Sequence, residues 1–110
     1  MLTSERRADR LFSEIITSVG RCDYCRSDSQ LTCAHIISRR FKSTRWDLDN
    51  AICLCFNHHR YFTEHPAEWI EYIDSRLGVG FYDRMRMKAN EVFRGDVADI
   101  VRGLEVALDR

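Results

Sequence analysis

Two pairs of potential metal ligands, each pair separated by two positions, constrain the fold of this 110-residue chain most strongly. The first pair is Cys22 and Cys25, and the second is Cys55 and His58. Three thiolates and one imidazole form a ligand set that zinc binds tetrahedrally, and paired ligands at this spacing are typical of structural zinc sites. The sequence therefore predicts a structural Zn²⁺ that joins two separate segments of the chain.

The other cysteines fit this interpretation. All five cysteines of the chain fall between residues 22 and 55. An odd number of clustered cysteines in a reducing compartment indicates metal ligation rather than disulfides. Cys53 competes with Cys55 as a ligand, but it lies in an apolar run, so we expect it to be a buried thiol, and we expect the same of Cys33.

Charge is balanced over the whole chain but not along it. The 17 basic and 17 acidic residues cancel. Between residues 21 and 60, however, seven Lys or Arg stand against four acids, whereas residues 61–110 carry seven against ten. The positive charge therefore coincides with the metal-ligand stretch, which is the sign that a phosphate-binding site requires.

Hydropathy argues against a membrane protein. No apolar run approaches the roughly 20 residues that a membrane-spanning helix needs. The N-terminal residues are charged and lack the apolar core of a secretory signal, so we expect a cytoplasmic protein without a membrane partner.

Periodicity and capping residues predict a single α+β domain over residues 1–110, with a core at about 20–66. A helix is expected over about 4–19, with Ser4 as its cap and Gly20 as its terminator. The core is expected to contain strands over 31–37 and 47–53, a basic loop over 38–45 and a helix from about Leu54. Pro66 opens the C-terminal helices, at about 66–109, in which 81–93 and 96–108 are helical and Asp96 is an N-cap. Their apolar stripes either close one core or form a homodimer interface.

Three polar residues stand at a second informative spacing. His35 precedes His59 by 24 positions, and Asn50 precedes His59 by 9. Together with the metal-ligand pairs and the run Ala34-His35-Ile36-Ile37, this pattern resembles the HNH, or ββα-metal, endonucleases over about residues 20–66. More narrowly, CAHIISRR at 33–40 followed by TRWDLDN at 44–50 resembles phage recombination endonucleases of the NinG/Rap kind.

The resemblance implies a zinc-stapled, treble-clef-like ββα core and metal-dependent hydrolysis of DNA that leaves 5′-phosphate and 3′-hydroxyl ends. It implies that His35 is the general base and that His59 binds a catalytic Mg²⁺, Mn²⁺ or Ni²⁺. It also implies that Asn50 hydrogen-bonds either backbone or His35 and so holds the surrounding loop. It also implies a DNA partner in the cytoplasm of a bacterial or phage-infected cell. The phosphate-binding residues would be Arg39, Arg40 and Arg45.

The sequence departs from the family at Ala34, where many members carry an acidic or histidine metal ligand. A substitute ligand is sought among Asp47, Asp49, Cys33 and His65. Thr63 stands where some relatives carry a further histidine. Two other functions therefore stay open, namely a zinc-stabilised DNA-binding module without cleavage and a structural zinc adaptor that binds no DNA.

Overall fold

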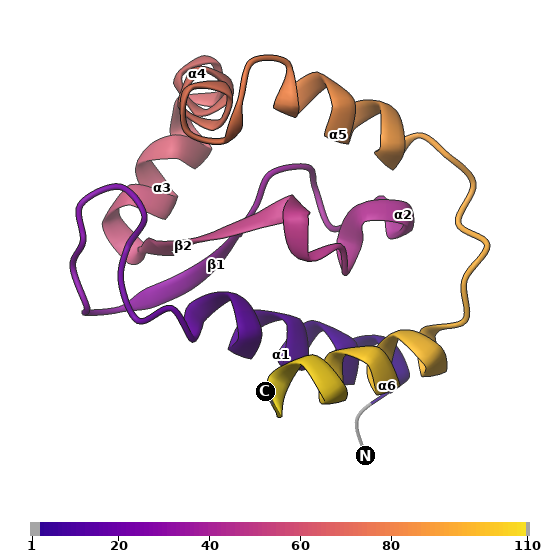
Figure 1. The fold of residues 1–110 in the computed structure, drawn as a ribbon. Coiled ribbons are helices and arrows are strands. Elements are labelled where there is room, and N and C mark those ends of the chain that lie inside the picture. Colours follow the sequence, from indigo (N-terminus) through magenta and orange to yellow (C-terminus); the bar gives the residue numbers. More distant parts are fainter. Residues whose placement is uncertain (1–2, 110) are drawn as a thin grey trace.

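A computed structural model describes residues 3–109, which form helices packed around a two-stranded antiparallel sheet (Figure 1). In chain order the elements are α1 (Ser4–Thr17), β1 (Leu31–His35), α2 (Lys42–Arg45), the 3₁₀ helix η1 (Leu48–Asn50), β2 (Ala51–Cys55), α3 (Phe56–Glu64), α4 (Pro66–Leu77), α5 (Phe81–Ala89) and α6 (Val97–Leu108). The expected mixture of helix and strand is confirmed. No helix within residues 3–109 is long and apolar enough to span a bilayer.

The second strand and the helix after it both begin later than the sequence pattern suggests. The strand expected over 47–53 lies at Ala51–Cys55, because the Asp47 carboxylate accepts a hydrogen bond from the Asp49 backbone N–H at 2.9 Å and closes a turn. The helix expected from Leu54 begins at Phe56, because Leu54 and Cys55 still pair with Thr32 and Leu31 in the sheet. Cys55 thus ends a strand and His58 lies in the first turn of α3.

Smaller differences concern the ends of other elements. Thr3, not Ser4, caps α1 by accepting a hydrogen bond from the Arg6 N–H at 3.2 Å. The first strand ends at His35, two residues early. The Ile36 N–H still makes a backbone bond to the Asn50 carbonyl, but the Ile37 N–H donates to the Asn50 side chain instead of continuing the ladder. The basic loop contains the short helix α2, and α5 ends at Ala89 rather than at 93. The expected roles of Pro66 and Asp96 at helix starts are confirmed.

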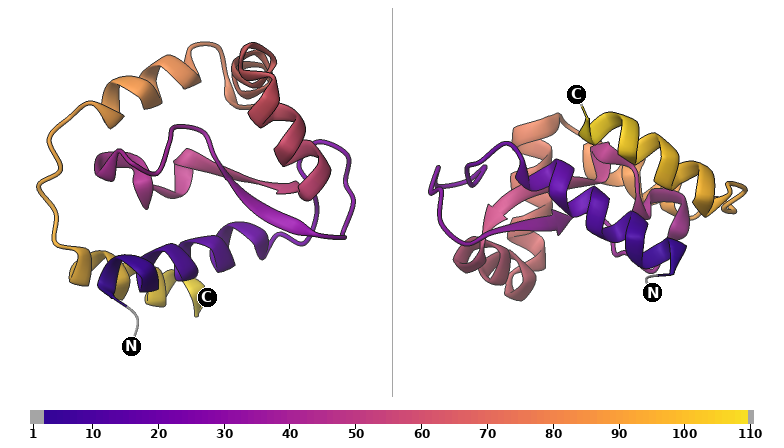
Figure 2. Two further views of the ribbon diagram at one scale, coloured as in Figure 1. Left: turned by 180° about the vertical axis from the view of Figure 1, so that it is seen from behind. Right: turned by 90° about the horizontal axis from the view of Figure 1, so that it is seen from below.

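Alternation along the strands separates two hydrophobic clusters, one on each face of the sheet. One cluster contains Leu54 of β2 and Ile73 of α4, both completely buried, and joins the sheet to α3, α4 and α5. The other contains Ala51 of β2, Phe12 of α1 and Leu104 of α6. Figure 2 shows α1 and α6 side by side on this second face, and α1 also packs against β1, the strand that carries His35.

Candidate functional site

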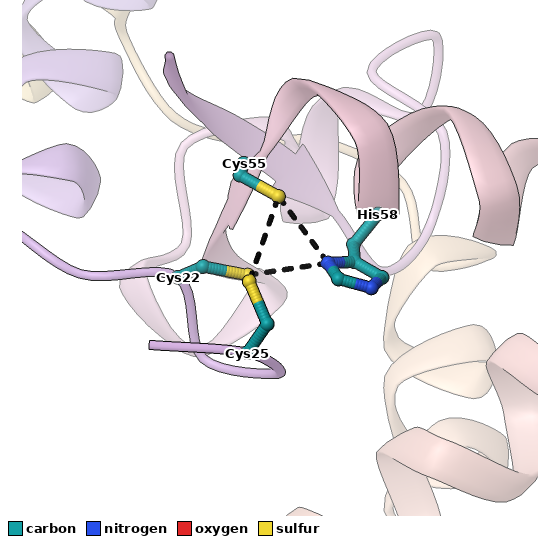
Figure 3. A group of neighbouring side chains, drawn as sticks. All are labelled: Cys22, Cys25, Cys55 and His58. Atoms are coloured by element: carbon teal, nitrogen blue, oxygen red, sulfur yellow. Dashed lines mark hydrogen bonds between the residues drawn. The ribbon is translucent and has the colours of Figure 1, made fainter. Parts of the chain in front are cut away.

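The predicted zinc ligands come together where three elements meet. A turn between α1 and β1 supplies Cys22 and Cys25, the end of β2 supplies Cys55, and α3 supplies His58. Their ligand atoms all lie within 4.8 Å of one another and point toward a common centre (Figure 3). The Asp23 N–H donates to the Cys53 carbonyl at 2.8 Å, which attaches the turn to β2.

The spacing of these atoms fits a tetrahedral zinc ion. Zinc bonds of about 2.3 Å to sulfur and about 2.0 Å to nitrogen, at tetrahedral angles, place two sulfurs about 3.8 Å apart and a sulfur and a nitrogen about 3.5 Å apart. The Sγ atoms of Cys25 and Cys55 are separated by 3.8 Å, and His58 Nδ1 lies 3.2 Å from Cys55 Sγ and 4.0 Å from Cys22 Sγ. The four residues can therefore hold a metal such as zinc after small side-chain shifts, because their ligand atoms lie within 4.8 Å of one another.

The acidity of one thiol in this cluster also suits a metal. Burial raises the pKa of the Cys22 thiol, but hydrogen bonds from the backbone N–H groups of Cys25, Cys55 and Tyr24 outweigh it and lower that pKa to about 6. Thiolate is the form that binds zinc.

A separate cleft of about 740 Å³ lies along the free side of β1. It is lined by residues from α1, β1, the basic loop and α3, including Asp9, Thr32, Cys33, His35, Arg39 and His59. The structure thus brings His35 and His59, which are far apart in sequence, to one cavity. Both side chains are partly buried in it.

Hydrogen bonds fix the orientation of His59. The Thr32 hydroxyl donates its single proton to the Leu54 carbonyl, at 2.7 Å. Its oxygen therefore accepts the proton of His59 Nδ1, at 2.8 Å, and Nδ1 is the protonated nitrogen of that ring. Nε2 of His59 is left with a free lone pair, and burial lowers the pKa of His59 so that the ring is neutral near pH 7. A neutral imidazole with one free nitrogen is a metal ligand.

His35 has the opposite protonation pattern. Its Nε2 lies 3.0 Å from the Arg45 carbonyl, which can only accept, so Nε2 carries the proton and Nδ1 is free. The ring of Phe12 stacks on His35 with centroids 5.1 Å apart. Burial lowers the pKa of His35, and the charge of Arg39 lowers it further. The free nitrogen of His35 is therefore ready to accept a proton near neutral pH.

Asn50 lies behind the cleft and is completely buried. Its side chain accepts from the Ile37 N–H at 2.9 Å and donates to the carbonyls of Ile37 and Thr44, both at 3.0 Å. These bonds clip together the two ends of the loop that follows His35. Every polar atom of the Asn50 side chain is satisfied by backbone, so it acts on the histidine only through this loop.

The three arginines expected at phosphate lie in different surroundings. Arg39 lines the cleft and is 61% exposed, whereas the exposed Arg40 lies over the ring of Phe41. Arg45 is only 18% exposed, and its guanidinium is bound to the carboxylates of Asp9 and Glu5. A phosphate role for Arg45 stays a prediction, because in this arrangement its side chain already has two partners.

The residues proposed as metal ligands in place of Ala34 lie in different surroundings. Cys33 lines the cleft, and burial raises the pKa of its thiol to about 12. Asp47 instead binds Lys88, and His65 lies within hydrogen-bonding distance of the Tyr61 carbonyl. Among residues 3–109, no group of three His, Cys, Asp or Glu residues gathers around His59 as Cys22, Cys25, Cys55 and His58 gather around their common centre.

Sequence reasoning missed Asp9 and Thr32, which line the cleft, and Phe12, which stacks on His35. Phe12 lies in the apolar stripe of an amphipathic helix, and Asp9 lies on its charged face, which such a helix usually turns to solvent. Thr32 sits in an ordinary strand pattern. Only the packing of α1 across β1 and the cross-strand hydrogen bond reveal their positions.

The four metal-ligand residues and the two cleft histidines lie in a segment that matches a known family. Residues 21–66 match the family model of the HNH endonucleases. The matched segment includes the four metal-ligand residues and His35, Asn50 and His59, and it leaves α1, α5 and α6 outside. Searches of curated proteins and of solved structures gave no significant match. The match supports the HNH family and nuclease-type activity, while the closer resemblance to the NinG/Rap-type enzymes stays a prediction.

Proposed function

We propose that this protein is a metal-dependent DNA endonuclease with His35 as its general base. One observation carries the proposal: His35 and His59 line the same cleft with opposite free nitrogens. His35 offers Nδ1 to a proton, and His59 offers Nε2 to a metal. In this proposal β1, β2 and α3 form the treble-clef-like ββα-metal core, stapled by a structural Zn²⁺ at Cys22, Cys25, Cys55 and His58.

The reaction follows from these two side chains. Nδ1 of His35 accepts a proton from water as the water oxygen bonds to phosphorus and the bond from phosphorus to the 3′ oxygen breaks. The products carry a 5′-phosphate and, after protonation, a 3′-hydroxyl. His59 holds a divalent cation such as Mg²⁺, Mn²⁺ or Ni²⁺, which when bound stabilises negative charge on the phosphate and the departing oxygen. Asn50 keeps the loop after His35 in place. The exposed Arg40 can contact phosphate, and so can the largely exposed Arg39, which lies 3.8 Å from the Asp9 carboxylate.

Within residues 3–109, His59 is the one residue of the cleft whose geometry clearly suits it to bind a catalytic cation. Divalent ions that retain several waters are commonly held by one or two protein groups together with substrate phosphate. The cleft therefore favours binding of the cation together with DNA rather than before it.

Nicking of supercoiled plasmid by zinc-loaded protein tests this function. We expect conversion to open-circle or linear DNA with Mg²⁺, Mn²⁺ or Ni²⁺ and none in EDTA at a concentration that leaves the circular dichroism spectrum unchanged. His35→Ala and His59→Ala should abolish cleavage, whereas His65→Ala, on the exposed junction of α3 and α4, should cleave normally. A branched DNA duplex should be tested as a second substrate, because residues 33–40 and 44–50 resemble recombination endonucleases.

A second function, DNA binding without cleavage, is favoured by Ala34 and by the single clear metal ligand of the cleft. It would be established if folded, zinc-loaded protein cut neither plasmid nor branched DNA with any metal but bound DNA in a salt-dependent way. Absence of any salt-dependent binding would leave the structural adaptor.

A further inference from the structure

An acidic residue lies in a cleft that is proposed to receive phosphate. Asp9 belongs to α1, outside the matched residues 21–66, yet its side chain lines the same cleft as His35 and Arg39. Hydrogen bonds from Arg45 and Trp46 more than offset burial and lower the pKa of Asp9, so it is ionised at neutral pH. A fixed negative charge there repels DNA, and its presence requires a compensating role.

The contacts of Asp9 are numerous for a single carboxylate. Oδ2 accepts from Arg45 Nη2 at 2.6 Å, and Oδ1 accepts from Arg45 Nε at 3.0 Å and from the Trp46 indole N–H at 2.9 Å. Arg39 lies at 3.8 Å from the same carboxylate. A forked pair of this kind, with only a fifth of the Asp9 side chain exposed, holds Arg45 in one orientation.

The same arginine orients the proposed base. The Arg45 carbonyl is the acceptor for His35 Nε2, and it belongs to the residue whose side chain Asp9 holds. Phe12, which follows Asp9 by three positions on α1, stacks against the His35 ring with an interplanar angle of 21°. Helix α1 therefore restrains His35 twice, once by stacking and once through Asp9 and Arg45.

We propose that Asp9 is a positioning residue of the endonuclease site, which fixes Arg45 so that its carbonyl holds His35 and which keeps Arg39 partly neutralised. This inference rests on the proposed function. The negative charge of Asp9 lowers the affinity of the cleft for DNA. In this inference the same charge fixes the orientation of the base, which explains its presence.

The two effects have opposite signs in the variant Asp9→Asn, which is nearly isosteric and still accepts a hydrogen bond. With the charge removed and Arg39 released, we expect DNA affinity at low salt to rise about three- to tenfold, and the slope of log K against log [salt] to steepen by about one. We expect the single-turnover cleavage rate at saturating DNA and metal to fall by about ten- to a hundredfold, because the base is less well placed. Binding and rate thus move apart.

The matched control is Glu14→Gln. Glu14 lies on the same helix, and within residues 3–109 its carboxylate pairs only with Arg10, at 4.0 Å, so this change removes one negative charge without touching the cleft. It should leave both the salt slope and the cleavage rate near wild type. Asp9→Glu, which restores the charge on a longer arm, should return DNA affinity to wild type but not the rate.

A measurement that needs no cleavage separates this inference from the proposed function. The ¹⁵N shifts of the His35 ring should report a proton on Nε2 in the zinc-loaded wild type and a mixture of both tautomers in Asp9→Asn. If no variant or wild type cuts DNA, the endonuclease proposal fails, while the tautomer and salt-slope results still decide the role of Asp9. An Asp9→Asn protein with the wild-type salt slope, or with an unchanged His35 tautomer, overturns the inference.

Discussion

His59 depends on a residue with no charge. The Thr32 hydroxyl is the acceptor for His59 Nδ1, and because its own proton goes to Leu54 it has no alternative role. An acceptor on the far nitrogen of a metal-binding histidine fixes the tautomer and the ring orientation. Thr32 therefore controls which nitrogen His59 turns toward the cleft.

Replacing Thr32 by valine keeps the shape of the side chain and removes the acceptor. We expect the concentration of Mn²⁺ needed for half-maximal cleavage to rise about ten- to a hundredfold, with much of the rate recovered at saturating metal. Thr17→Val, at the end of α1, where the hydroxyl bonds only to backbone carbonyls of its own helix, serves as the control. An unchanged metal requirement in Thr32→Val would show that His59 is oriented by other contacts.

The surroundings of His35 predict how the rate of cleavage depends on pH. Burial, followed by the charges of Arg39 and Arg45, holds the pKa of His35 below its ordinary value of 6.5, against the opposing effects of Asp9 and the Arg45 carbonyl. A base must be neutral, so kcat/KM at saturating metal should rise with pH through this lowered pKa and level off by pH 7. Arg39→Gln removes a positive charge near the ring, so the pKa rises and the acidic limb should move to higher pH. Arg40→Gln should leave it in place, and equal profiles for both variants would contradict the assignment.

At the scale of elements, the end of β2, the start of α3 and the turn before β1 are joined by the four metal ligands. Cys25 is an exposed member of this set, so its replacement by serine removes a ligand without opening a cavity. We expect Cys25→Ser to bind no stoichiometric zinc and its free energy of unfolding to fall by on the order of 5 kcal/mol. Chelation of zinc from the wild type should lower the free energy of unfolding by a similar amount. Cys53→Ala, a buried thiol outside the set, should retain zinc and lose only about 1 kcal/mol. Retention of both zinc and melting temperature by Cys25→Ser would exclude a structural metal.

The cluster of four candidate metal ligands was predictable because their chemistry is local and their spacing is regular. The start of β2 was not, because Asp47 closes a turn within a run that otherwise suits a strand, and side-chain bonds of this kind do not appear in hydrophobic periodicity. The position of α1 was equally hidden. Nothing in its amphipathic pattern tells which sheet face it covers, and that face determines whether Asp9 meets solvent or the cleft.

At the scale of the whole molecule, the cleft is formed by two parts of the chain that pack together. Residues 31–64 supply both histidines of the cleft. Helix α1 supplies Asp9, stacks Phe12 on His35 and is itself covered by α6. Arg7 and Glu105 also join α1 to α6, at 2.7 Å. Since much of the α6 stripe is buried within the chain, it is less free to form the homodimer interface that its sequence allowed, and we expect a monomer in light scattering.

This arrangement predicts that a distant core residue affects cleavage. Leu104 of α6 is buried in the cluster that contains Phe12, whereas Ile73 of α4 lies in the cluster on the opposite face. Substitution of either by alanine should cost about 2–5 kcal/mol. Only Leu104→Ala, however, loosens the helix that stacks on His35, so at a temperature where both variants are folded it should cleave several-fold more slowly per folded molecule than Ile73→Ala. Equal rates, measured beside circular dichroism melts, would mean that α1 holds its place without α6 and that the catalytic cleft is independent of the C-terminal helix.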